Sequence, residues 1–121
     1  MSVPRSRSTD KFTDYYHLLT QIGVGGYGRV WTCVEKRTQQ TRAVKIVPDK
    51  LYRRKSWSAE YGKQLPDEAV LWLPLSHPNM VSLLEVFYIP ATKYWFLVMD
   101  YDEQYRTLGY VGVLKASVYS P

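Results

Sequence analysis

Residues 22–30 read Ile-Gly-Val-Gly-Gly-Tyr-Gly-Arg-Val and contain the spacing GxGxxGxV. Glycines lack a Cβ, so a loop backbone that contains them can approach phosphate oxygens closely and present N–H groups to them. A dinucleotide-binding fold needs a helix directly after such glycines, whereas a strand–loop–strand phosphate loop needs a second strand. Here Val30, Thr32 and Val34 alternate along one face, which predicts a strand. A glycine-rich hairpin turn without a ligand explains the loop alone equally well.

Two charged residues further along the chain favour the phosphate loop. Ala43-Val44-Lys45 places a lysine on the next predicted strand, at a spacing from which its ammonium can reach phosphates under the loop. Glu68 lies on a predicted helix and can hold that lysine as an ion pair. Taken singly, Lys45 also fits a solvated strand residue, and Glu68 fits a first-turn glutamate favoured by the helix dipole. Their joint occurrence, in this order, favours a nucleotide site.

The elements that must position these residues form a short series. β-Branched and aromatic runs predict strands at residues 15–24, 29–35, 41–47, 81–88 and 94–101. A helix is predicted at residues 67–73, with Pro66 suited to its first position and Pro74 ending it. Residues 50–64 show no clear period. The predicted fold class is α+β, with a five-stranded antiparallel sheet and one helix against it.

Length and composition restrict the remaining possibilities. The chain has 121 residues, 45% hydrophobic and 22% charged, which predicts one compact unit and excludes two complete domains. The apolar runs at residues 69–75 and 94–99 are far shorter than the roughly 18 residues that span a bilayer. The start lacks an apolar signal segment, and Ser2 stands where myristoylation needs glycine. We therefore expect a cytoplasmic or nuclear protein without a membrane partner. The single cysteine, Cys33, cannot form an intrachain disulfide, which fits a reducing compartment, and we expect it to be a small buried residue.

The net charge of +5 raises the question of nucleic-acid binding. Basic residues gather in the Ser-rich start and at residues 50–55, but neither segment interleaves them with aromatic residues as a stacking platform does. We therefore expect no nucleic-acid partner. Residues 1–13 offer little to bury, which predicts a disordered basic tail.

With these motifs in order, residues 14–108 resemble the small N-terminal lobe of a protein kinase. The resemblance implies that Val30 and Ala43 cover adenine, that Lys45 binds phosphate, and that Glu68 is its partner. Residues 96–102 look like the strand that enters the hinge, with Met99 as gatekeeper. The implied cofactor-binding residues are Ile22, Gly23, Val24, Gly25, Gly26, Tyr27, Gly28, Arg29, Val30, Ala43, Lys45, Met99 and, through backbone groups, Asp100 and Asp102.

Within the kinases, residues 65–71 and 106–108 are most similar to the Pim serine/threonine kinases. Pim kinases carry a proline in the hinge where this chain has Asp102, so the resemblance implies that an adenine hydrogen bond is restored here. Residues 109–121 do not look like the helix that follows a kinase hinge. They form an atypical C-terminal tail, which suggests a truncated or alternatively spliced end.

The resemblance also implies what lies outside these 121 residues. They contain no His-Arg-Asp, Asp-Phe-Gly or Ala-Pro-Glu motif, which supply the catalytic base, the magnesium ligands and the substrate platform. The implied function is the ATP-binding portion of a serine/threonine protein kinase, with ATP and Mg²⁺ as cofactors. Protein substrate is expected only with a large lobe. The alternative is a non-catalytic fragment that acts as an interaction or decoy module.

Other residues are weaker candidates. His17 and His77 are too isolated for a zinc site. Arg53-Arg54-Lys55-Ser56 resembles a substrate site of basophilic kinases and equally fits a solvated basic turn. Four aromatic residues fit a core, or a face covered by a large lobe, better than a ligand surface: Trp31, Trp72, Tyr94 and Trp95.

A lobe without its partner lobe has two expected properties. Half a cleft leaves adenine exposed to water, so nucleotide affinity should be weak. The uncovered face should present an apolar patch, which favours self-association or chaperone binding.

Overall fold

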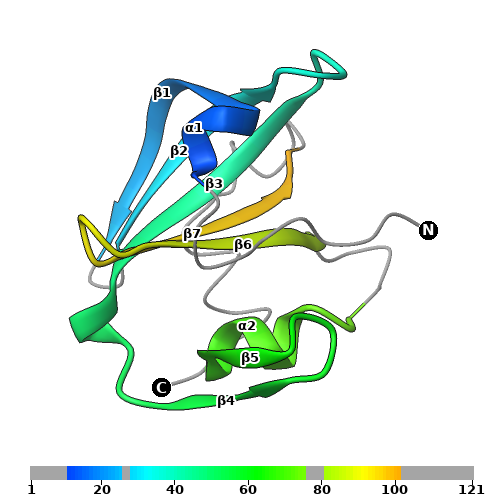
Figure 1. The fold of residues 1–121 in the computed structure, drawn as a ribbon. Helices are drawn as coiled ribbons and strands as arrows, with labels where there is room; N and C mark the ends of the chain where they lie inside the picture. The colour runs from blue at the N-terminus through cyan, green and yellow to red at the C-terminus, as the bar shows by residue number, and fades with distance from the viewer. Residues whose placement is uncertain (1–10, 26–27, 76–80, 102–121) are drawn as a thin grey trace.

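The computed structural model describes residues 11–25, 28–75 and 81–101. Its main feature is the predicted five-stranded antiparallel sheet, with strand order β1-β2-β3-β7-β6 (Figure 1). The strands are β1 (Tyr16–Gly25), β2 (Gly28–Glu35), β3 (Thr41–Pro48), β6 (Leu83–Ile89) and β7 (Tyr94–Asp100). Side chains alternate across a strand, so the sheet has two faces, each with its own apolar cluster.

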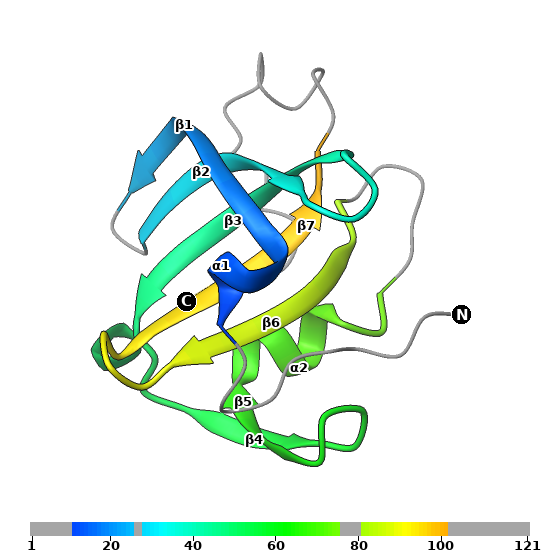
Figure 2. The same cartoon turned by 45° about the horizontal axis from the view of Figure 1, so that its top comes forward.

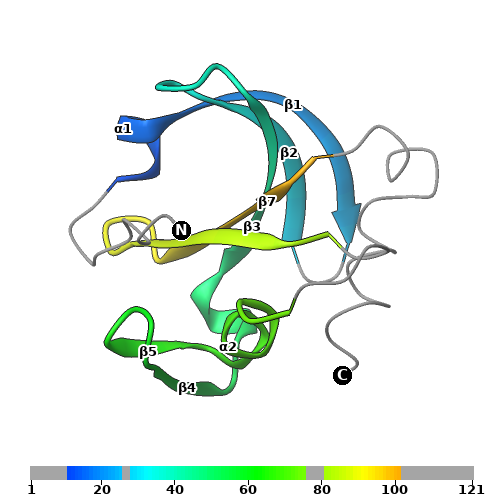
Figure 3. The same cartoon turned by 90° about the vertical axis from the view of Figure 1, so that its right-hand side faces the viewer.

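The inner face, which carries Val30, Ala43 and Met99, packs against the predicted helix. This helix, α2 (Asp67–Trp72), lies with a small hairpin on one side of the sheet (Figure 3). Trp72 is fully buried and its indole N–H donates to the Val81 carbonyl at 2.8 Å. A buried Trp N–H needs such a partner, and this bond ties the end of α2 to the chain just before β6. No helix in the described ranges is long and apolar enough to span a membrane.

The outer face carries a second, aromatic cluster that the sequence analysis did not predict. A short helix, α1 (Phe12–Tyr15), lies over this face (Figure 2). Phe12 is only 1% exposed, and its ring stacks on Tyr16 and Phe96 with centroid distances of 5.0 and 4.8 Å. A disordered tail reaching residue 13 is therefore wrong for Phe12 and Thr13, because one aromatic ring finds a site on the sheet. Residues 1–10 of that tail lie outside the described residues.

The hairpin on the inner side was also missed. It consists of β4 (Lys55–Ser58) and β5 (Lys63–Pro66), which pair only with each other. A 3₁₀ turn (Asp49–Leu51) precedes it. The helix begins at Asp67, as predicted, and Pro66 is not its first helical residue but the extended N-cap residue that ends β5. The helix ends at Trp72, before Pro74, as predicted.

Candidate functional site

The centre of the site is an ion pair between β3 and α2. Lys45 Nζ lies 2.7 Å from Glu68 Oε2, and the two side chains are only 4% and 3% exposed. Lys45 lies opposite Val30 of β2 and Leu97 of β7 in the register, so it rises from the middle of the sheet. Because a buried charge is costly unless it is paired, this contact fixes both groups. The predicted pair is therefore formed, and its role in phosphate binding stays a prediction.

Tyr52 completes the surroundings of Glu68. Its hydroxyl donates to Glu68 Oε1 at 2.5 Å, while Lys45 takes the other carboxylate oxygen. Tyr52 follows the 3₁₀ turn after β3 and is half-buried. The sequence analysis missed it, because no periodic pattern marks a residue that reaches the site through a turn. A carboxylate held at both oxygens has little freedom to leave Lys45.

The glycine segment joins β1 and β2 as a tight hairpin. Val24 pairs with Arg29 and Gly25 with Gly28, so the strands stay together up to the turn. Gly28 has φ +132°, and a Cβ there would lie 2.4 Å from the Ile46 carbonyl oxygen. Glycine is thus required at residue 28 by the backbone itself. Gly26 and Tyr27 lie outside the described residues, so the hairpin-turn and phosphate-loop interpretations both remain open.

The residues expected to cover adenine do share the inner face with Lys45. Val30, Ala43 and Met99 belong to one apolar cluster, with Ile22 packed against it. Ala43 lies opposite Met99 in the β3–β7 register. Val30 is 1% exposed and the other two are fully buried. These three side chains are therefore buried within the lobe itself, and the expectation that adenine would be exposed to water in half a cleft stays a prediction.

Two predicted loop residues point elsewhere. The side chains of Val24 and Arg29 are exposed and line a groove on the outer face. Only their backbone remains for a ligand on the Lys45 side, and the prediction that they belong to the nucleotide-binding loop stays a prediction. At the hinge, the Asp100 N–H donates to the Ser82 carbonyl at 3.0 Å. This N–H is therefore not available to hydrogen-bond an adenine ring. Asp102 lies outside the described residues.

The weaker candidates have ordinary surroundings. Cys33 is fully buried, as predicted, and this burial raises the pKa of its thiol to about 12. The Ser56 hydroxyl donates to Asp67 at 2.6 Å, so the basic segment before it leads into β4 and does not present a free serine. Trp72 and Trp95 are in the core, as expected, whereas Trp31 and Tyr94 line the outer groove. His77 lies outside the described residues.

Comparison with known proteins identifies the architecture. The family model of the protein kinase domain matches residues 16–115. This chain belongs to the protein kinase domain family. Its sheet and α2 form the small lobe of that domain, as the sequence predicted, and Lys45 and Glu68 are its strand–helix ion pair.

Several serine/threonine kinases are similar to this kinase lobe. Serine/threonine-protein kinase par-4 of Caenorhabditis elegans is 35% identical over 67% of this chain. Sperm motility kinase 1 of Mus musculus is 35% identical over 78%, and calcium-dependent protein kinase 5 of Plasmodium falciparum is 35% identical over 66%. The chain spans only 13% to 17% of the length of these relatives.

The two implied cofactors fit the described residues differently. Lys45 supplies a fixed cation on the face that holds Val30 and Ala43, the apolar residues that the resemblance assigns to the purine ring. For a metal, the ranges 11–25, 28–75 and 81–101 contain no group of three or more His, Cys, Asp or Glu side chains that could act as ligands. The described part of this kinase lobe fits the nucleotide and provides no magnesium site.

Proposed function

We propose that this chain is the ATP-binding lobe of a serine/threonine protein kinase. The observation that carries the proposal is the buried Lys45–Glu68 pair, 2.7 Å apart, on the face that also holds Val30 and Ala43. Lys45 would neutralise charge on the ATP phosphates, and Glu68 would keep its ammonium in place. Residues 23–30 would cover the phosphates, with their backbone as donors.

The transferred group would be the ATP γ-phosphate and the acceptor a serine or threonine hydroxyl of a protein. Transfer would require a large lobe, since the base and magnesium ligands of the family are not among these 121 residues. The similarity to named serine/threonine kinases supports the choice of acceptor. Within that class we propose a Pim-like lobe, on the residues at 65–71 and 106–108.

A chimera tests this proposal directly. The large lobe of an active serine/threonine kinase is joined after Leu108, and phosphate transfer from MgATP to a basic serine peptide is measured. We expect transfer, and a loss of about 100-fold or more in Lys45→Met, which is the scale for removing one electrostatic group from a phosphoryl-transfer site. The matched control is Lys63→Met, at a lysine of the β4–β5 hairpin. A folded chimera that is inactive contradicts the proposal and favours the decoy module. A chimera that is equally active with Met at residue 45 contradicts the role proposed for Lys45.

A further inference from the structure

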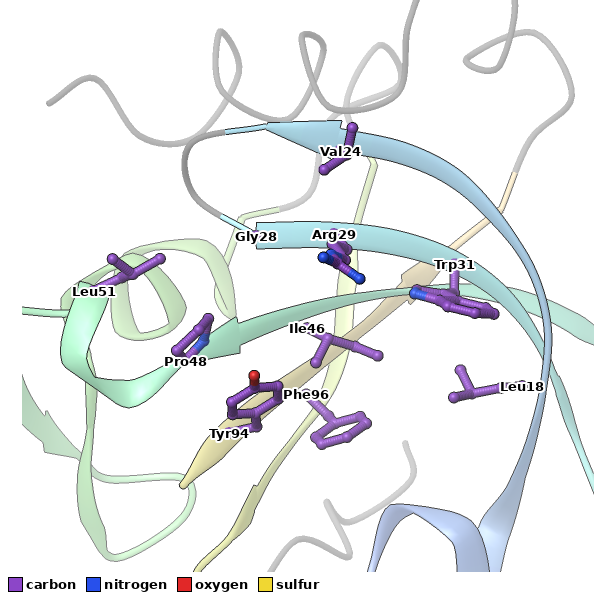
Figure 4. A pocket seen from close by; sticks show the side chains of 10 residues that line it. All are labelled: Leu18, Val24, Gly28, Arg29, Trp31, Ile46, Pro48, Leu51, Tyr94 and Phe96. Carbon is purple, nitrogen blue, oxygen red and sulfur yellow. The ribbon is translucent and has the colours of Figure 1, made fainter. Parts of the chain in front are cut away.

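A groove of about 510 Å³ lies on the outer face of the sheet, on the side opposite Lys45. Its walls come from β1, β2, β3 and β7, and Figure 4 shows Arg29 between Val24 and Ile46, with the rings of Tyr94 and Phe96 on the far side of Ile46. Val24, Gly28 and Arg29 of the glycine segment line the groove, but the described side chains assigned to ATP, such as Val30, Ala43 and Lys45, lie on the inner face.

The groove is apolar and open to water. Val24 is 65% exposed and Tyr94 is 42% exposed, although both line it. Trp31, Ile46 and Phe96 are half-buried and form its floor together with the outer-face aromatic cluster. Exposed apolar residues that are contiguous, and not scattered singly, are typical of a surface that a partner covers.

Arg29 gives the groove a charge. Its side chain is exposed, and no carboxylate of residues 11–25, 28–75 or 81–101 forms an ion pair with it. A guanidinium beside Trp31 and Ile46 is a planar cation surrounded by apolar surface. Such an arrangement suits an acidic side chain that is flanked by apolar ones.

The chain itself shows what this face accepts. Phe12 of α1 stacks on Phe96 at 4.8 Å, and Asp14 lies within the same short helical turn. Phe96 also lines the groove, so the groove continues the surface on which Phe12 docks. The occupied half therefore holds an aromatic ring of this chain, and the open half has aromatic walls and, in Arg29, a positive charge.

We propose that this groove docks a peptide segment of a partner protein that carries an aromatic anchor next to an acidic residue. The ring packs between Trp31, Ile46 and Phe96, and the carboxylate pairs with Arg29. Because the groove and Lys45 lie on opposite faces, this interaction does not depend on the proposed nucleotide site.

Fluorescence anisotropy of the 121-residue chain with a labelled peptide tests the proposal. The probe carries two phenylalanines that flank two glutamates, and a second probe has lysines in place of the glutamates. Arg29→Glu and Tyr94→Ser both change exposed side chains, and Arg53→Glu makes the same charge change outside the groove. Thermal unfolding of each variant establishes that it is folded.

We expect the acidic probe to bind, the lysine probe to bind at least about 10-fold more weakly, and Arg29→Glu and Tyr94→Ser each to lose about 10-fold. Arg53→Glu should change the affinity for the acidic probe less than about twofold, since an exposed charge outside the groove contributes little. Equal losses in Arg29→Glu and Arg53→Glu, or no binding at millimolar probe, would overturn the proposal. Sedimentation showing self-association that Tyr94→Ser abolishes would overturn it too, by assigning the groove to a second copy.

Discussion

The hydroxyl of Tyr52 donates a 2.5 Å hydrogen bond to the same carboxylate, Glu68, whose other oxygen contacts the Lys45 ammonium. Glu68 is 3% exposed, so water has little access to either oxygen. The position of the lysine is therefore set by three elements: β3, α2 and the turn that connects β3 to the hairpin. We infer that Tyr52 contributes to the stability of the pair although it lies outside the family motif.

Replacing Tyr52 with phenylalanine tests that inference. We expect Tyr52→Phe to lower the free energy of unfolding by about 1.5–3 kcal/mol, the range for losing a hydrogen bond to a charged group. Urea denaturation measures this value, and Tyr94→Phe, at an exposed ring, is the matched control. A double-mutant cycle with Glu68→Gln should show coupling, and additive losses would argue that the two side chains do not interact.

The Lys45–Glu68 pair gives an asymmetric mutational pattern. Lys45→Met leaves a buried carboxylate without its cation and should cost about 3–5 kcal/mol of stability. Lys45→Met combined with Glu68→Leu removes both charges, and we expect the double variant to be more stable than Lys45→Met alone. Chemical denaturation of wild type, Lys45→Met and the double variant decides the question. If the double variant is the least stable, the unpaired carboxylate is not the cause of the stability loss in Lys45→Met.

Cys33 predicts a stability change at alkaline pH. Burial raises the pKa of its thiol from 9.0 to about 12, so the folded state favours the neutral thiol. This contribution is fully present below pH 9 and is lost as the pH rises toward 12. Because other groups titrate there as well, wild type is compared with Cys33→Ala: the stability of the variant should fall less steeply from pH 9 to 11.

The burial of Cys33 can also be tested by chemical modification of its thiol. A thiol reagent at pH 8 should leave folded Cys33 unmodified and react fully after denaturation, because only the thiolate attacks. Rapid modification of the folded chain would contradict the burial of this residue.

The contribution of Asp49 to stability should depend on pH in the opposite direction. The hydrogen bond from Trp95 Nε1, at 2.7 Å, and secondly the nearby Lys55 ammonium lower the pKa of this carboxyl below 3.8. Its stabilisation is thus present above pH 3.8 and is lost as the pH falls through the folded-state pKa. Asp49→Asn should be less stable than wild type at pH 7, with the difference shrinking near pH 3, as followed by urea denaturation at each pH. Asp14→Asn, at an exposed carboxylate, is the matched control, and a constant difference would contradict the assignment.

The sequence predicted the elements with strong periodicity. Strands β2 and β3 alternate in burial or form apolar runs, and acidic residues after Pro66 mark the start of α2, so these elements could be recognised locally. The β4–β5 hairpin could not, because its strands are short, polar and stabilised by the helix beside them. Phe12 likewise looks like part of a polar tail until the sheet provides an aromatic site for it.

The residues of the candidate site also fall into those with a local sequence signal and those without one. Lys45 and Glu68 could be predicted because their order and spacing relative to the glycines are local properties of the sequence. Tyr52 could not, since it contacts Glu68 only after the chain turns back through the 3₁₀ segment. The direction of the Arg29 side chain could not be predicted either, because the glycine motif fixes the loop but not which way each neighbouring side chain points.

The most direct measurement of the central claim is labelling of the large-lobe chimera with an acyl-phosphate derivative of ATP, which acylates lysines near its bound phosphates. Lys45 is only 4% exposed, so a simple amine reagent should modify it far less than the exposed Lys36 and Lys93. With the ATP probe we expect the reverse preference: Lys45 becomes the main labelled site by peptide mass spectrometry, and excess MgATP suppresses it. If the probe labels the same exposed lysines as the amine reagent, with Lys45 unmodified, this lobe does not hold ATP at the Lys45–Glu68 pair.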